Sequence, residues 1–117
     1  MPASRELMDL AAWDELWKRQ AAAGAGRLLI FKKSPICPVS SMAERGFRAY
    51  LKEAPEGLTI VEVDVVNRRP VSQKIAADTG VRHESPQALL LGPGGKVLWH
   101  DSHEGISGES LAEAVGS

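Results

Sequence analysis

The chain has 117 residues, of which 44% are hydrophobic and 25% charged, with a formal net charge of -1 at pH 7. This composition is typical of one soluble domain spanning residues 1–117 and excludes a disordered chain. The balance of 14 basic against 15 acidic residues provides no basic surface for nucleic acid. The apolar runs are far shorter than the roughly 20 residues that span a bilayer, and no secretory signal is recognisable, so we expect a cytoplasmic protein.

The first half of the chain predicts a helix, a strand and a second helix. Apolar residues recur at three- and four-residue intervals from Leu7 to Trp17, which predicts an amphipathic helix that ends before Gly24. The run RLLIFKK at 27–33 lies between a glycine and a Ser-Pro pair, and its length favours a buried strand. After this run, apolar residues are again spaced to lie on one side of a helix, which predicts a helix over about 38–53.

The second half predicts a strand, a helix, a hairpin and a closing helix. The run LTIVEVDVV at 58–66 is rich in β-branched residues, which favours a strand. A segment at 70–81 begins with proline and closes on a glycine, as helices often do. Two apolar runs within 87–101 are separated by GPGG and predict a β-hairpin. The last segment, SGESLAEAV at 107–115, predicts a short helix with a serine cap.

The predicted order of elements is α, β, α, β, α, β, β, α. The strand-helix-strand unit implies a right-handed parallel crossover, and the hairpin adds an antiparallel pair. This order predicts an α/β, thioredoxin-like fold, which is a mixed four-stranded sheet with helices on both faces. Other small α/β domains share the order.

The only cysteine, Cys37, lies in KKSPICPVS between the first predicted strand and the second predicted helix. The first turn of a helix has backbone N–H groups without partners and carries partial positive charge, so it favours an anion. Thiols at helix N-termini accordingly have pKa values lowered from about 8.5 into the range of about 3.5–7.5. Pro38 fits the first helical position, where no N–H is needed. We therefore predict a reactive, catalytic Cys37; the alternative is an inert buried cysteine.

Ser40 occupies the position at which dithiol oxidoreductases have their second cysteine. A serine can donate a hydrogen bond to the Cys37 thiolate, but it cannot displace a sulfur. The expected chemistry is therefore monothiol: Cys37 attacks a mixed disulfide, takes the small-thiol adduct, and is released by an external thiol. The alternative role for Ser40 is helix capping. Lys32 and Lys33, at the strand's exit, either add positive potential or are solvated.

The segment VRHESPQALLL places Pro86 directly before a predicted strand. This position in the predicted fold indicates a cis Ser85-Pro86 bond, with the Ser85 backbone beside the thiol and able to pair with an extended substrate. An ordinary trans proline at the start of a strand is the alternative.

Three segments in this order, FKKSPICPVS, VRHESPQALLL and VLWHDSHEGI, resemble the YtxJ-like monothiol bacilliredoxin family from about Trp13 to the C-terminus. The resemblance implies a thioredoxin-fold oxidoreductase that removes bacillithiol from mixed disulfides on cytoplasmic proteins. Bacillithiol is then a co-substrate, and no cofactor is tightly bound. At the matching positions, Cys37 accepts the adduct and Pro86 is the cis-proline. Two positions depart from the family pattern: Ile36 precedes the cysteine, and EGI follows His103 where an aromatic is common.

The three histidines, His83, His100 and His103, lack the spacing of metal ligands, and we expect no metal site. His83 approaches either Cys37 or a loop carbonyl. Three other functions remain open: a glutaredoxin-like iron–sulfur carrier, a non-catalytic thioredoxin-like interaction domain, and a peroxidase. The absence of an N–H at Pro38 counts against the carrier, and the short chain counts against the peroxidase.

Overall fold

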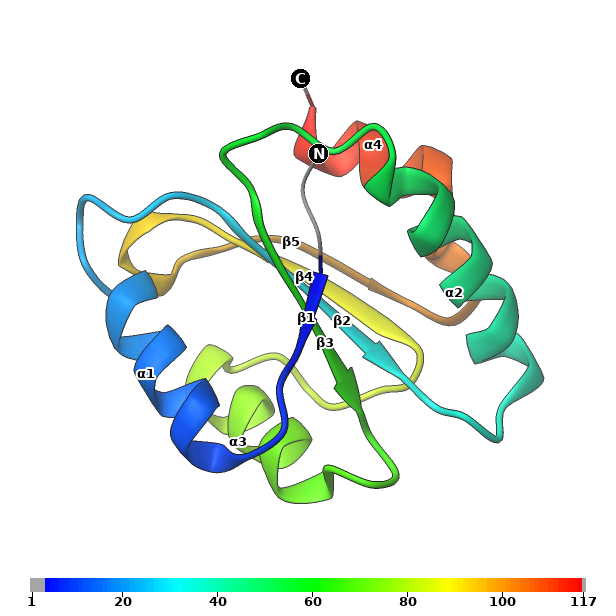
Figure 1. The fold of residues 1–117 in the computed structure, drawn as a ribbon, viewed down its shortest axis with the longest axis horizontal. Coiled ribbons are helices and arrows are strands. Elements are labelled where there is room, and N and C mark those ends of the chain that lie inside the picture. The colour runs from blue at the N-terminus through cyan, green and yellow to red at the C-terminus, as the bar shows by residue number, and fades with distance from the viewer. Residues whose placement is uncertain (1–3, 117) are drawn as a thin grey trace.

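The computed structural model describes residues 4–116, so both ends of the predicted 1–117 domain lie outside the described residues. A mixed sheet lies between two layers of helices (Figure 1). No helix in this part of the chain is long and apolar enough to cross a bilayer. The elements, in chain order, are β1 (Ser4–Glu6), α1 (Leu10–Gln20), β2 (Leu28–Lys33), α2 (Pro38–Leu51), β3 (Thr59–Asp64), α3 (Arg69–Thr79), β4 (Gln87–Leu91), β5 (Val97–Ser102) and α4 (Gly108–Val115), with short 3-10 turns at Pro93–Gly95 and His103–Gly105.

The sheet has the strand order β1-β3-β2-β4-β5. Strand β2 runs parallel to β3 and antiparallel to β4, which in turn pairs with β5 as the predicted hairpin. The predicted mixed sheet with helices on both faces is confirmed, but it has five strands rather than four. The additional strand, β1, pairs in parallel with β3, from Ser4 opposite Ile60 to Glu6 opposite Glu62.

The first helix begins later than predicted. Helix α1 starts at Leu10, and the Asp9 carboxylate caps it by accepting a hydrogen bond from the Ala12 backbone N–H at 2.8 Å. Leu7 is fully buried, but its backbone is not helical; its N–H donates to the Glu62 carbonyl at 2.9 Å. An apolar residue three positions before Leu10 thus imitates the helical period, although it lies directly after β1.

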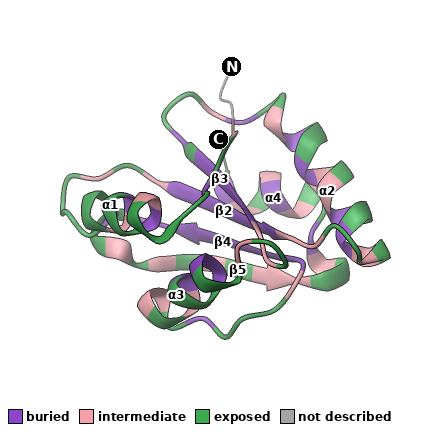
Figure 2. Ribbon diagram, turned by 60° about the horizontal axis from the view of Figure 1, so that its bottom comes forward, coloured by how far each residue is buried: buried purple, intermediate pink, exposed green. Residues whose placement is uncertain are grey.

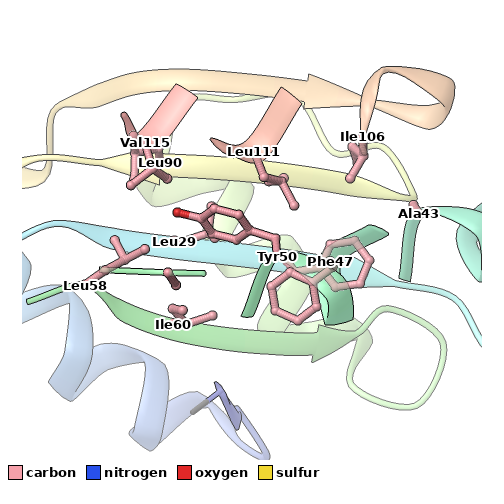
Figure 3. Close-up of a cluster of buried hydrophobic side chains, with 13 residues drawn as sticks. Leu29, Ala43, Phe47, Tyr50, Leu58, Ile60, Leu90, Ile106, Leu111 and Val115 are labelled. Atoms are coloured by element: carbon pink, nitrogen blue, oxygen red, sulfur yellow. The ribbon is translucent and has the colours of Figure 1, made fainter. Parts of the chain in front are cut away.

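The core has two parts, one on each face of the sheet. Alternate residues of β2 serve both: Leu29 and Phe31 face α2 and α4, whereas Leu28 and Ile30 face α1 and α3. The rings of Phe31 and Phe47 stack with centroids 4.5 Å apart. Figure 3 shows the first part of the core, in which side chains of α2 and α4 meet those of the sheet. The central strands are buried along their length, while the helices expose their outer faces (Figure 2). This packing fixes where α2 begins relative to the exit of β2.

Candidate active site

Cys37 is the N-cap residue of α2, with extended backbone angles of φ -103° and ψ 123°. Pro38 follows in the first turn, as predicted, and the Ser41 N–H donates to the Cys37 carbonyl at 3.1 Å to begin the helical ladder. The thiol is free and partly exposed. The structure thus places the sulfur at a helix start with access to solvent, which is inconsistent with a sealed core position.

The first turn of α2 offers donors to an anion at this position. An N-cap side chain is placed to accept from the backbone N–H of the second or third helical residue, here Val39 or Ser40. Pro38 has no N–H to contribute. The Cys37 side chain makes no capping hydrogen bond in the structure, so these donors are available to a thiolate or to the oxygen atoms of a bound substrate.

Ser40 is fully buried, and its hydroxyl accepts a hydrogen bond from the Ser34 backbone N–H at 2.7 Å. The contact fastens the loop after β2 to the first turn of α2. An accepting hydroxyl keeps its own O–H as a donor, so the predicted donation to the Cys37 thiolate is compatible with this contact and stays a prediction. Ser40 is thus a loop anchor in addition to any effect on the thiol.

The Ser85-Pro86 peptide bond is cis, as the position of Pro86 predicts. The next residue, Gln87, pairs with Lys32 in the antiparallel β2-β4 register. Since β2 leads out toward Cys37 from this end, Pro86 lies at the same edge of the sheet as the thiol. The Ser85 hydroxyl is buried there and has no hydrogen-bond partner among the described residues. The predicted role of Ser85 and Pro86 in substrate binding stays a prediction.

Three loops meet at this edge of the sheet. Lys33 at the end of β2 lies opposite Asp64 at the end of β3, and the Val65 N–H donates to the Lys33 carbonyl at 2.9 Å. The loops that follow β2 and β3 and the loop that precedes β4 gather at one end of the molecule (Figure 1). We call this end, formed by residues 34–37, 65–67 and 82–86, the active-site rim.

Lys32, at the end of β2 next to the rim, has unexpected surroundings. As a strand-exit lysine it was expected to be solvated or to add charge near the thiol, yet its side chain is fully buried on the α3 face. The Lys32 Nζ donates to the Ser72 carbonyl at 3.1 Å and lies 3.3 Å from His83 Nδ1. Burial lowers the pKa of Lys32 to about 8. The signal for this burial was the central position of its strand, which the hairpin and the crossover helix predict to be covered on both faces.

His83 faces α3, whereas the sequence placed it against Cys37 or a loop carbonyl. Its Nδ1 lies 3.0 Å from the Ser72 hydroxyl, in addition to the Lys32 contact. Burial, followed by the positive charges of Lys32 and Arg69, lowers the pKa of His83. The ring is therefore neutral near pH 7.

A model of the monothiol bacilliredoxin family, BrxC, matches residues 5–111. The chain belongs to this family. Together with the fold, the membership makes the protein a thiol-disulfide oxidoreductase, and it agrees with the resemblance carried by the three sequence segments.

Solved structures confirm the thioredoxin fold of this bacilliredoxin. A protein inferred to be an oxidoreductase with a thioredoxin fold is 28% identical and superposes with a TM-score of 0.77, covering 95% of this chain and 92% of its own. The thioredoxin of Fasciola hepatica is 19% identical, with a TM-score of 0.68 and 95% of each chain covered. The Malassezia sympodialis thioredoxin is 14% identical, with a TM-score of 0.67 and coverages of 98% and 90%.

An ion-pair network around the buried Glu62 carboxylate supports the rim of the bacilliredoxin. The Glu62 carboxylate accepts from Arg48 at 2.5 Å, from Lys33 at 3.0 Å and from the Ser4 hydroxyl. Lys33 also pairs with Glu6. Burial of the Glu62 carboxyl acts to raise its pKa, but these hydrogen bonds outweigh burial and lower the pKa to about 2. The network joins β1, β2, β3 and α2, and so holds the strand exit in place.

Three large apolar side chains are exposed on the segments that carry or neighbour Cys37. Ile36, directly before Cys37, is 79% exposed, Met42 on α2 is 65% exposed, and Val66 on the neighbouring loop is 47% exposed. Single exposed apolar residues are ordinary, but three of this size on α2 and on two loops at the same end of the sheet are candidates for a contact surface.

His100 lies within β5, opposite Leu89, and His103 lies directly after β5. His103 Nε2 is 3.4 Å from a Glu84 carboxylate oxygen, and the Ser102 hydroxyl donates to the same carboxylate. Within residues 4–116 no group of three or more His, Cys, Asp or Glu side chains is arranged to hold a metal ion.

Proposed function

We propose that the protein removes bacillithiol from mixed disulfides on cytoplasmic proteins through Cys37. The observation that carries the proposal is the partly exposed thiol at the N-cap of α2, with Ser40 in the position of a resolving cysteine. Membership of the monothiol bacilliredoxin family supports the choice of small thiol and of thiolated proteins as partners. Bacillithiol is a co-substrate in this proposal, and no tightly bound cofactor is required.

The reaction is an exchange between two sulfurs in each step. The Cys37 thiolate attacks the bacillithiol sulfur of the mixed disulfide, the bond to the client sulfur breaks, and the client leaves as a thiolate that takes a proton from water. Cys37 is then disulfide-bonded to bacillithiol. With serine at position 40, the adduct waits for the thiolate of a second small thiol, which attacks the bacillithiol sulfur and releases Cys37. Over the complete cycle the enzyme is neither oxidised nor reduced.

The rim provides what this reaction needs from the protein. The N–H groups of Val39 and Ser40 stabilise negative charge on the attacking sulfur. The exposed side chains of Ile36, Met42 and Val66 give apolar contact to a client protein around the modified cysteine. Because these contacts are not directed at particular side chains, the surface suits many clients.

Intact-mass spectrometry tests the proposal. The reduced protein is mixed with one client protein carrying bacillithiol, glutathione or coenzyme A on the same cysteine. We expect fastest loss of the bacillithiol adduct from the client, with a bacillithiol adduct appearing on Cys37. The Cys37→Ala variant should show no transfer. Its denaturation midpoint should equal that of the wild type, because the Cys37 side chain makes no capping hydrogen bond.

Two outcomes contradict the proposal. Transfer that persists in Cys37→Ala removes the assigned nucleophile, and equal rates with all three adducts remove the preference for bacillithiol. A visible charge-transfer absorption in protein purified without oxygen would instead indicate an iron–sulfur carrier.

A further inference from the structure

A cavity of about 400 Å³ opens on the α3 side of the active-site rim. It is lined by the loop after β3, the first two turns of α3 and the residue two positions before Ser85; these residues are Val65, Val66, Arg69, Ser72, Gln73 and His83. None of the reaction steps proposed above uses it.

The cavity lies within reach of Cys37. Its wall residue Val65 is hydrogen-bonded to the Lys33 carbonyl at 2.9 Å. Cys37 is four positions after Lys33, and such a segment spans at most about 14 Å when extended. A small thiol of tripeptide size is about 10 Å long on the same scale. Val65 and Val66 line the cavity and also belong to the active-site rim, so one molecule can occupy the cavity with its polar end and present its sulfur at the rim.

The charge of the cavity favours an anion. Its ionisable lining residues are Arg69 and His83, and none of the six is acidic. The nearest acids are engaged elsewhere: the Asp64 carboxylate accepts from the Val66 and Asn67 N–H groups, and Glu84 is turned to Ser102 and His103.

Arg69 stands where helix stability disfavours a cation. It is in the first turn of α3, directly after Arg68, and that turn contains no acidic residue. A positive charge there opposes the helix dipole and is unfavourable for helix stability. A residue placed against its local preference is characteristic of a binding site.

The buried lysine sets the hydrogen-bonding state of His83. An ammonium group has donors only, so Lys32 Nζ, at 3.3 Å, requires His83 Nδ1 to accept. The neutral imidazole then carries its proton on Nε2. This N–H, the Arg69 guanidinium and the Gln73 amide are three donors of the kind that bind carboxylates, and the guanidinium can bind one in a two-pronged manner.

We propose that this cavity binds the carboxylate end of the small thiol and so directs Cys37 to the small-thiol sulfur of the mixed disulfide. The inference rests on the proposed function and adds the residues that select the thiol. The matching chemistry is a dicarboxylate such as the malyl group of bacillithiol. A neutral thiol such as 2-mercaptoethanol offers no group to these donors.

Two variants test the assignment as a matched pair. Arg69→Gln and Arg68→Gln each remove one positive charge from the start of α3, but Arg68 lines a different cavity, on the α1 side. Release is measured from one client protein carrying either bacillithiol or 2-mercaptoethanol. We expect Arg69→Gln to raise KM for the bacillithiol adduct by about tenfold or more, the usual effect of losing a charged hydrogen bond, and to leave the 2-mercaptoethanol adduct unaffected. Arg68→Gln should change neither.

A binding measurement without catalysis completes the test. L-malate is titrated into the Cys37→Ala variant, with and without Arg69→Gln, and backbone amide shifts are followed by NMR. Shifts centred on Val66, Ser72 and Gln73 that vanish with Arg69→Gln support the site; shifts that are absent, or unaffected by Arg69→Gln, overturn it. Equal KM values in the two arginine variants overturn it as well. If the wild type releases neither adduct, the proposed function itself fails. The malate titration still shows whether the cavity binds a carboxylate.

Discussion

The Ser40 hydroxyl accepts the Ser34 backbone N–H at 2.7 Å and so closes the loop that carries Cys37. Ser40 is fully buried, whereas Cys37 is partly exposed, so the two residues of the Cys-x-x-Ser motif have different surroundings. A thiol at position 40 would be a weak acceptor for the Ser34 N–H. Serine is therefore the better structural residue at this position, independent of its inability to resolve a disulfide.

Replacing Ser40 with alanine should destabilise the protein by about 1–3 kcal/mol, because the Ser34 N–H loses its partner in a half-buried position. Urea denaturation followed by circular dichroism measures the change. The neighbouring Ser41 is exposed, so Ser41→Ala is the matched control and should lie within about 0.5 kcal/mol of the wild type. Equal stability of the two variants would show that the Ser34 contact contributes nothing.

Gly46 is required by packing between helices, not by its backbone conformation. A Cβ at this position would lie 2.9 Å from the Gly108 N and 3.1 Å from the Ser107 Cα, both backbone atoms at the start of α4. Alanine in a helix interior ordinarily gains about 1 kcal/mol over glycine. We expect Gly46→Ala to reverse that sign and destabilise by about 1–3 kcal/mol, since α4 must shift away from α2.

Gly24→Ala is the comparison for this variant, because nothing lies within 4 Å of a Cβ at that position. Its thermal midpoint should equal or exceed that of the wild type. A stabilised Gly46→Ala would mean that α4 moves without cost, and it would remove the explanation for glycine in the middle of α2.

Most elements could be predicted because their signals are local. Pro38 directly after Cys37 marks the start of α2, Ser107 caps α4 through the Ser110 N–H, and Gly80 ends α3 with a φ of 76°. Each is a property of one or two neighbouring residues. The place of Cys37 at a helix start follows from the same kind of signal.

The features that escaped prediction depend on distant partners. Strand β1 has three residues and exists because it pairs with β3, some 56 positions away in sequence, so it has no periodic pattern of its own. The cluster of Lys32, Ser72 and His83 joins β2, α3 and the loop before β4. No spacing in the sequence brings these three together; the connection from β3 through α3 to β4 and the antiparallel pairing of β4 with β2 do.

The Glu62 network should make stability fall in acid. Hydrogen bonds from Arg48, Ser4 and Lys33 outweigh burial and lower the pKa of Glu62 to about 2. A carboxyl whose pKa is lower in the folded than in the unfolded state stabilises above its unfolded pKa, near 4.3, and loses this as pH falls toward 2. We expect a loss of about 1–2 kcal/mol over this window in urea titrations, and a smaller loss in Glu62→Gln.

Glu44 is the matched control for Glu62, since it pairs with the same arginine at 3.0 Å but is more than a third exposed. Glu44→Gln should retain the acid dependence of the wild type and change stability by less than about 0.5 kcal/mol. If Glu62→Gln keeps the full pH slope, other carboxylates carry the acid sensitivity.

Lys32 and Lys33 should have opposite effects on stability, although they are neighbours. Burial lowers the pKa of Lys32 to about 8, so its charged form disfavours folding below pH 8, and stability should rise as pH increases from 8 toward 10.5. Lys32→Met keeps the apolar stem, removes this rise, and should stabilise the protein by about 1–3 kcal/mol at pH 7.

For Lys33, burial acts to lower the pKa, but Glu6 and Glu62 outweigh it and raise the pKa. Lys33→Met should therefore destabilise the protein at pH 7. Urea denaturation at half-unit steps from pH 7 to 10.5 compares the three proteins, and parallel profiles for Lys32→Met and the wild type would show that Lys32 is not buried in its charged form.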